Sequence, residues 1–291
     1  MNATFDLFAG LASIPMGEDH YDLGHGVTLS RTFAHLNGSF ILAFAHPKAP
    51  GEAHPAPWLS VPGGSSFDVV AELRVPAQVP KGMGTSMDVA RTVLMMLRLG
   101  VHPGIASPVI ANFPLASMPG RPANEVWLRA NERSERFFRV ESEATAITPD
   151  HAAWLAKTWP VAMKLQRESE EFALALQALD ASHFIQSTAL SLVSLWAALE
   201  ALFSPSTSEL RFRVSALLAT FLEEPGTGRH DLQRQVSKLY DKRSAAAHGK
   251  PKHEDEDLLA TMNLVVRALV KMLNEEKVTS KADIEGCLFG R

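Results

Sequence analysis

Proline divides this 291-residue chain into two unlike halves. The short segment 46–62 alone contains five prolines, and no helix can persist through it because each proline lacks a backbone N–H and blocks the preceding turn. From about Thr148 proline becomes rare and apolar residues recur at helical spacing. The sequence therefore predicts an α+β domain over residues 1–147, followed by an all-α helical bundle over residues 148–291.

Short β-rich runs bounded by turn residues fill the first half. We expect strands at 26–33, 39–45 and 66–75, and a hairpin within 124–140 that turns at 131–134. One helix is expected at 86–99, with Ser86 as its N-cap and Gly100 as its stop.

Helical periodicity governs the second half, with helices expected at 149–179, 182–203, 209–223, 229–248 and 255–276. Thr148 can cap the first of them, and Pro149 suits its first position. The acidic run 254–257 precedes the last helix, where the helix dipole favours negative charge. We interpret that run as a helix N-terminus and not as a metal site.

Composition excludes several classes of protein. The chain is 46% hydrophobic and 21% charged, with a net charge of −4, so attraction to nucleic acid would need a local basic patch. Its most apolar stretch, 189–203, is too short to cross a bilayer, and the N-terminus lacks the basic residues of a secretory signal. Cys287 is the single cysteine, which excludes a disulfide framework. A cytoplasmic protein without membrane, metal or cofactor is expected.

The fourth predicted helix carries the pattern that points to chemistry. Segment 240–249 reads YDKRSAAAHG, in which Arg243 is followed after four residues by His248. Upstream lie LWAALEALF at 195–203 and ELRFR at 209–213. Together these segments resemble the Apea-like branch of the HEPN superfamily, whose motif is R-x4-H, and the resemblance extends over residues 182–274.

This resemblance implies a metal-independent endoribonuclease that cuts RNA as a homodimer and leaves 2′,3′-cyclic phosphate ends. Carried over to this sequence, Arg243 would bind the scissile phosphate and His248 would act as the acid–base group. Ser244 and Tyr240 would support them, although many family members carry Asn, Asp or His at the position of Ser244. The resemblance also implies a role in antiviral defence or a toxin-like system, in which the first half would sense a trigger or select the substrate.

Ideal helix geometry separates the two motif residues. Five residues along a helix correspond to a rotation of about 140°, so Arg243 and His248 would not share a face. A left-handed helix end at Gly249 could redirect His248, or a second copy of the chain could supply the missing half of the site. Both alternatives remain open at the level of the sequence.

Glu200 lies within the apolar stripe of its helix, in register with Val193 and Trp196. A carboxylate buried there without a partner would be costly, so we expect it to face a cation. The candidate partners are Arg243, Arg213 and Arg211. We interpret Glu200 as a residue that positions the motif arginine.

Positive charge gathers around the motif and could follow an RNA backbone; the proposed RNA-binding lysines are Lys238, Lys242, Lys250 and Lys252. Each of these features also has an interpretation without a functional role. The lysines could be a solvated helix face, and His248 could serve only as a helix cap. A Ser244–His248 hydrolase is disfavoured because no nucleophile elbow is present. The alternative function is a non-catalytic HEPN module that binds RNA or nucleotide or mediates dimerisation.

Overall fold

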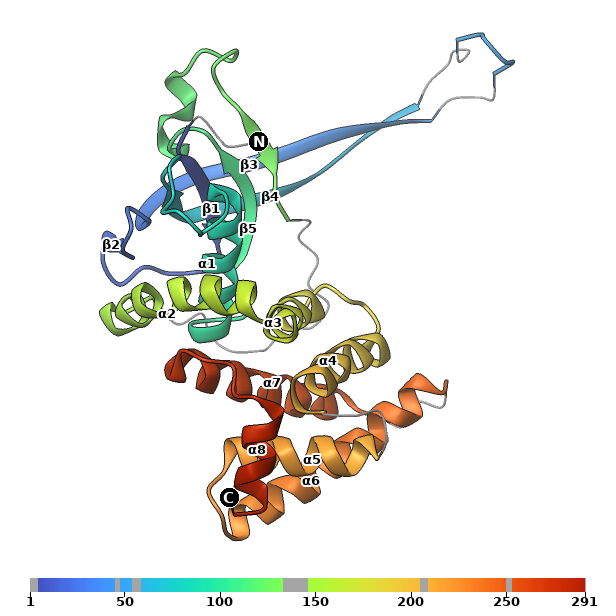
Figure 1. The fold of residues 1–291 in the computed structure, drawn as a ribbon. Coiled ribbons are helices and arrows are strands. Elements are labelled where there is room, and N and C mark those ends of the chain that lie inside the picture. The colour runs from blue at the N-terminus through green and yellow to red at the C-terminus, as the bar shows by residue number, and fades with distance from the viewer. Residues whose placement is uncertain are drawn as a thin grey trace.

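A computed structural model describes residues 5–44, 48–53, 59–132, 146–204, 209–249 and 253–290. An antiparallel sheet is followed by layers of helices, and the C-terminal helix lies on the side of the helical region away from the sheet (Figure 1). The predicted order of an α+β region and then a helical region is confirmed at this level.

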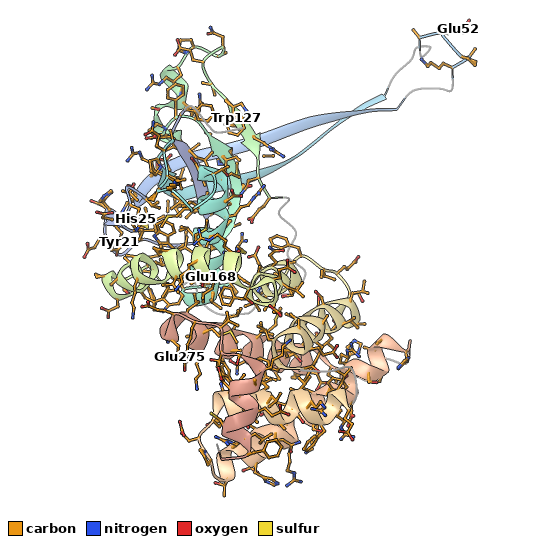
Figure 2. All side chains as sticks on the ribbon, viewed as in Figure 1. Tyr21, His25, Glu52, Trp127, Glu168 and Glu275 are labelled. Atoms are coloured by element: carbon orange, nitrogen blue, oxygen red, sulfur yellow. The ribbon has the colours of Figure 1, made fainter. Side chains whose placement is uncertain are left out.

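Within the described residues the sheet has six strands, in the order β2-β3-β4-β1-β5-β6, and every neighbouring pair is antiparallel. They are β1 (Leu7–Ala12), β2 (His20–Asp22), β3 (Thr28–Phe44), β4 (Leu59–Val75), β5 (Ala106–Ala111) and β6 (Leu128–Ala130). The two strands expected at 26–33 and 39–45 are one, because β3 continues through an irregularity between Arg31 and Ala34. The ends of β3 and β4 extend from the body as an arm, and Glu52 lies at its tip (Figure 2).

The hairpin expected within 124–140 lies partly outside the described residues. Its described portion contains β6, which pairs with β5.

The two faces of the sheet are covered differently. Helix α1 (Ser86–Gly100) packs on one face through residues such as Val93 and Leu97. A short 3-10 helix, η1 (Leu115–Gly120), lies on the other, where Leu115 contacts a small cluster with Val69 and Val109. A Cβ at Gly10 would lie 2.6 Å from Leu115 Cδ1, so the absence of a side chain there lets η1 approach the sheet.

The helical region consists, in its described part, of α2 (Pro149–Glu168), α3 (Glu170–Ser182), α4 (Thr188–Phe203), α5 (Leu210–Leu222), α6 (Thr227–Ala247), α7 (Asp255–Glu275) and α8 (Lys281–Leu288). The single helix expected at 149–179 is wrong: it breaks at Ser169, whose hydroxyl accepts a hydrogen bond from Phe172 N at 3.1 Å and caps α3. Ser182 ends α3 and does not begin α4, which Ser187 caps. Helix α8 was not predicted.

Side-chain caps explain where several helices begin. Thr148 and His151 form a reciprocal cap at α2, as the sequence predicted for Thr148. At α1 the cap is Thr85 and not Ser86, since Thr85 Oγ1 accepts from Asp88 N. The acidic run does lie at the start of α7, where Glu254 and Asp257 cap the first turn.

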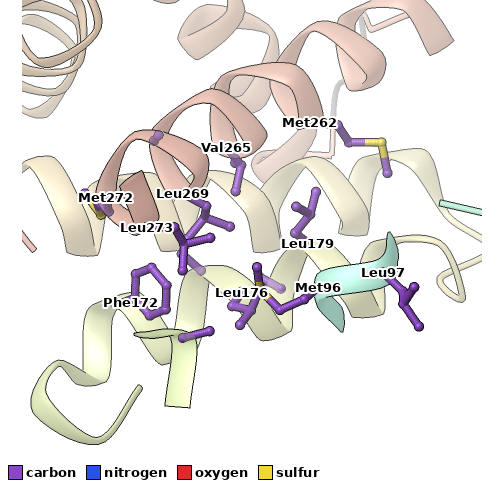
Figure 3. Close-up of a cluster of buried hydrophobic side chains, with 14 of the residues drawn as sticks. Met96, Leu97, Phe172, Leu176, Leu179, Met262, Val265, Leu269, Met272 and Leu273 are labelled. Carbon is purple, nitrogen blue, oxygen red and sulfur yellow. The ribbon is translucent and has the colours of Figure 1, made fainter. Parts of the chain in front are cut away.

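One hydrophobic core joins the sheet region to the helices. Met96 of α1 lies beside Leu176 of α3, and Leu269 of α7 lies across from them (Figure 3). In the same core, Trp159 of α2 donates its indole N–H to the Leu23 carbonyl at 2.8 Å. The core therefore continues past residue 147, and the division of the chain at that point stays a prediction. No described helix is long and apolar enough to cross a membrane.

Candidate functional site

Helix α6 presents the motif arginine to α4. Tyr240 is one of the α6 residues buried against the bundle, and its ring meets Trp196 of α4 edge to face, with centroids 5.2 Å apart. Arg243 follows Tyr240 by three positions and Glu200 follows Trp196 by four, so both lie about one turn further along the same contact. The packing of the two aromatic rings thereby brings Arg243 to Glu200.

The predicted cation partner of Glu200 is confirmed, and it is Arg243. Its Nη2 lies 3.1 Å from Glu200 Oε1 and donates a hydrogen bond to Oε2 at 3.4 Å. The two side chains are 21% and 18% exposed, so the pair lies at the edge of the core. The other two candidates are engaged elsewhere, Arg211 with Asp241 at 3.0 Å and Arg213 with Glu285 at 3.8 Å.

This ion pair leaves hydrogen-bonding capacity unused. Glu200 Oε1 and Arg243 Nε are buried, and neither has a hydrogen-bond partner among the described residues. The contact is therefore not the two-pronged fork that gives arginine–carboxylate pairs their full strength. The guanidinium also lies over the Tyr240 ring, 5.5 Å from its centroid. Arg243 is thus oriented by its neighbours, and its Nε is itself buried, out of reach of a ligand.

Tyr240 completes this cluster, which we call the Glu200–Tyr240–Arg243 cluster. Burial raises the pKa of the Tyr240 phenol above its ordinary value, and the charge and hydrogen bonding of Glu200 raise it further, while Arg243 acts in the opposite direction. The phenol therefore stays protonated at neutral pH. It can donate a hydrogen bond but cannot serve as a base there.

His248 lies at the C-terminal end of α6 as its capping residue. Gly249 has φ +68°, which confirms the left-handed helix end that its glycine predicted. The His248 side chain is exposed and makes no hydrogen bond or ion pair with any residue that the structure describes. Within one chain, no polar contact joins it to the Glu200–Tyr240–Arg243 cluster. Ser244 is half-buried, and its hydroxyl likewise has no hydrogen-bond partner in the described part of the chain.

The predicted RNA-binding lysines have different surroundings. Lys242 Nζ lies 3.3 Å from Asp257 Oδ2 at the start of α7, so a carboxylate already offsets its charge. Lys238 is exposed on α6. Lys250 and Lys252 lie outside the described residues. The basic patch remains a prediction.

Sequence reasoning missed two residues that shape the cluster. Trp196 is fully buried beneath Tyr240. The sequence feature that could have predicted this contact is the position of Trp196 in the same apolar stripe as Glu200. Asp257 was interpreted only as a helix-capping residue, and nothing in the sequence pairs it with Lys242. No group of three or more His, Cys, Asp or Glu side chains among the described residues could hold a metal ion.

Comparison of the chain with protein-family models, with curated proteins and with solved structures finds no match. The fold and the site thus define an α+β protein with a helical region that carries an Arg–Glu–Tyr cluster next to an exposed terminal histidine. The resemblance to the HEPN superfamily rests on the residues of this sequence and stays a prediction.

Proposed function

We propose that this protein is a HEPN-type endoribonuclease, a metal-independent hydrolase of the cytoplasm that acts as a homodimer in an antiviral or toxin-like system. One observation carries the proposal. The guanidinium of Arg243 is held against Glu200 at 3.1 Å, its side chain is 21% exposed, and it is followed on the same helix by the exposed His248.

These groups match the needs of RNA cleavage. The ribose 2′-oxygen attacks the adjacent phosphorus, the bond to the 5′-oxygen breaks, and a 2′,3′-cyclic phosphate remains. One proton leaves the 2′-hydroxyl and one reaches the departing oxygen, transfers that a histidine can perform near neutral pH. A fixed guanidinium stabilises the charge that develops on the phosphate. In this scheme Arg243 binds the phosphate, His248 moves the proton, and Glu200 and Tyr240 position Arg243, with Ser244 as a further donor.

A second candidate function is a non-catalytic HEPN module that binds RNA or a nucleotide. Two observations favour it. Within one chain no polar contact joins His248 to the described Glu200–Tyr240–Arg243 cluster, and only 21% of the Arg243 side chain is exposed. This candidate predicts affinity for RNA without cleavage.

Cleavage of RNA in the presence of excess chelator separates the two functions. We expect the full chain to cut a mixed RNA pool without added metal and to leave 2′,3′-cyclic phosphate ends, identified by mass spectrometry. His248→Ala should abolish cutting and leave RNA affinity within about twofold, since the affinity of such proteins comes mainly from phosphate contacts.

His230→Ala is the matched control, because His230 is an exposed histidine on the same helix, near its opposite end. It should cut like the wild type. If the wild type, His248→Ala and His230→Ala are equally inactive on diverse RNAs and still bind them, the non-catalytic function is the correct one.

A further inference from the structure

A cavity of about 710 Å³ lies between α1, α2 and α3, away from the Glu200–Tyr240–Arg243 cluster. Its size is within the range of sites that bind small molecules. Its walls come from distant parts of the chain: the loop Gly82–Gly84 with α1, the end of α2, the middle of α3 and the two residues after β6. The cavity thus lies where the sheet region meets the helices.

A buried ion-pair network fixes one wall of this cavity. The Arg98 side chain is 4% exposed and pairs with Asp180 at 2.8 Å and with Glu132. Its Nε donates to the Ile105 carbonyl at 3.0 Å. Because two carboxylates face one guanidinium, this network carries one net negative charge; it makes the wall rigid and does not attract anions.

Two other arginines line the same cavity and have no carboxylate partner among the described residues. Arg91 is exposed and makes no ion pair or side-chain hydrogen bond with a described residue. Arg167 is also exposed and, within the described part of the chain, donates only to the Gly82 carbonyl. Asp88, three positions before Arg91, also lines the cavity, but its carboxylate caps the helix, where it accepts from Thr85 N at 2.9 Å and Thr85 Oγ1 at 2.7 Å. This part of the cavity therefore suits an anionic group, which arginine binds well as a planar fork.

The rest of the lining suits a flat polar ring. Met83, Met95 and Met163 supply polarizable, adaptable surfaces. Gln166 donates its amide to Thr92 Oγ1 at 3.1 Å, which fixes the side chain and leaves its carbonyl oxygen as an acceptor. Gln177 is exposed and makes no side-chain hydrogen bond with a described residue, so its amide can both donate and accept.

We propose that this cavity binds a nucleoside monophosphate. The phosphate lies between Arg91 and Arg167, the base lies against the methionines, and Gln166 and Gln177 hydrogen-bond its edge. The site is independent of the proposed ribonuclease activity. Since its walls belong to both the sheet region and the helices, an occupant holds α1 against α2 and α3 and raises the stability of the whole chain.

Calorimetry and thermal unfolding of the full chain with adenosine and guanosine 5′-monophosphate test the proposal. We expect saturable binding of at least one of them and a rise in Tm, with adenosine and orthophosphate each about tenfold weaker or more. Arg91→Gln and Arg167→Gln should each weaken binding about tenfold. Arg121→Gln is the matched control, because Arg121 is exposed and lies over Phe113, next to η1 and outside the cavity lining. It should bind like the wild type.

Met163→Trp fills the cavity without changing its charge and should also weaken binding, with circular dichroism as the check that it folds. The proposal is overturned if neither nucleotide binds at millimolar concentration, or if Arg91→Gln and Met163→Trp bind as tightly as the wild type. Orthophosphate binding as tightly as the nucleotides would also overturn it, because the base would then contribute nothing.

Discussion

Glu200 and Arg243 meet at the edge of the core, where each side chain keeps about a fifth of its surface exposed. Breaking a fully buried ion pair costs about 3–5 kcal/mol, and breaking an exposed one costs about 0–1 kcal/mol. We expect Glu200→Gln, which keeps the shape and removes the charge, to cost about 1–2 kcal/mol. Chemical denaturation would show this as a lower midpoint with an unchanged slope. RNA cleavage should fall as well, because Arg243 loses its fixed orientation.

A double-mutant cycle isolates this contact from the general effect of each substitution. Combined with Arg243→Gln, the Glu200→Gln variant should lose less stability than the two single losses added together. Arg213→Gln is the control, since Arg213 pairs with Glu285, and its combination with Glu200→Gln should be additive. Additivity in the first cycle would contradict the assignment of Glu200 to Arg243.

The buried carboxyl of Glu72 leads us to expect that the stability of the protein depends on pH. It is buried on the η1 face of the sheet and accepts a hydrogen bond from Leu115 N at 2.6 Å. Burial raises the pKa of its carboxyl above the ordinary 4.5, while that hydrogen bond lowers it. Because the pKa of Glu72 is raised in the folded state, its protonated carboxyl contributes to the free energy of unfolding. This contribution is fully present below about pH 4.5 and is lost as pH rises through the folded-state pKa. Glu72→Gln keeps an acceptor and does not titrate.

We therefore expect Glu72→Gln to be more stable than the wild type at pH 7, by about 1.4 kcal/mol for each unit by which the pKa is raised. The difference should disappear near pH 4, when denaturation midpoints are compared across pH. Glu224→Gln, a change at an exposed carboxylate, serves as the control. The opposite result would be a variant that loses stability relative to the wild type when the pH is raised from 4 to 7. It would show that the ionised carboxylate of Glu72 is favourable in the folded protein.

At the scale of elements, the contact between α1 and α2 depends on a residue without a side chain. A Cβ at Gly100 would lie 2.1 Å from Cζ3 of the Trp154 ring. Gly100→Ala must push α2 away or turn the ring, and we expect a loss of about 1–3 kcal/mol. Gly228 of α6 is the matched control: the nearest atom to its Cβ would be 3.9 Å away, so Gly228→Ala should gain about 0.5–1 kcal/mol. Thermal unfolding measures both.

Replacing the indole ring with a smaller side chain, in the double variant Gly100→Ala/Trp154→Leu, should restore part of the stability that Gly100→Ala loses. A Gly100→Ala variant as stable as the wild type would mean that Trp154 swings aside freely and that α1 and α2 are not in close contact there.

Helices with regular apolar stripes were predictable from the sequence, and other elements were not. The stripe of α7 indicated its helix directly, and Glu200 was predictable as a paired residue because an unpaired carboxylate in an apolar stripe is costly. Strand β1 was missed because it is buried on both faces and shows no alternation. The break at Ser169 was missed because neither glycine nor proline marks it, although a serine before two glutamates is typical of a helix start.

At the scale of the whole molecule, the sequence could not show what the continuous core brings together. Arg98, Glu132 and Asp180 form one ion-pair network, yet they lie far apart along the chain and no local pattern links them. The same holds for the cavity beside them. Tyr21 shows the link at the other end of α2, where its hydroxyl donates to the Ile147 carbonyl at 2.8 Å (Figure 2). The sheet region is thus coupled to the helices at several separate points.

Assembly of two chains decides whether the proposed active site is complete. Arg243 and His248 lie about 140° apart on an ideal helix, and no polar contact joins His248 to the described cluster around Arg243 in one chain. Ala245 and Ala246 between them are half-buried and small, which permits the close approach of a second α6. We infer a two-fold dimer in which the Arg243 of one chain and the His248 of its partner act on the same phosphate.

Mixed dimers test this inference, since Arg243→Gln and His248→Ala should each be inactive alone. Co-refolded in equal amounts, they should recover about a quarter of the wild-type rate, because half of the dimers are mixed and each of these has one intact site of two. Mixing Arg243→Gln with Arg243→Gln/His248→Ala is the control and should recover nothing. If the first mixture also stays inactive although light scattering shows dimers, both residues act within one chain. If micromolar protein is only monomeric, the shared site does not exist.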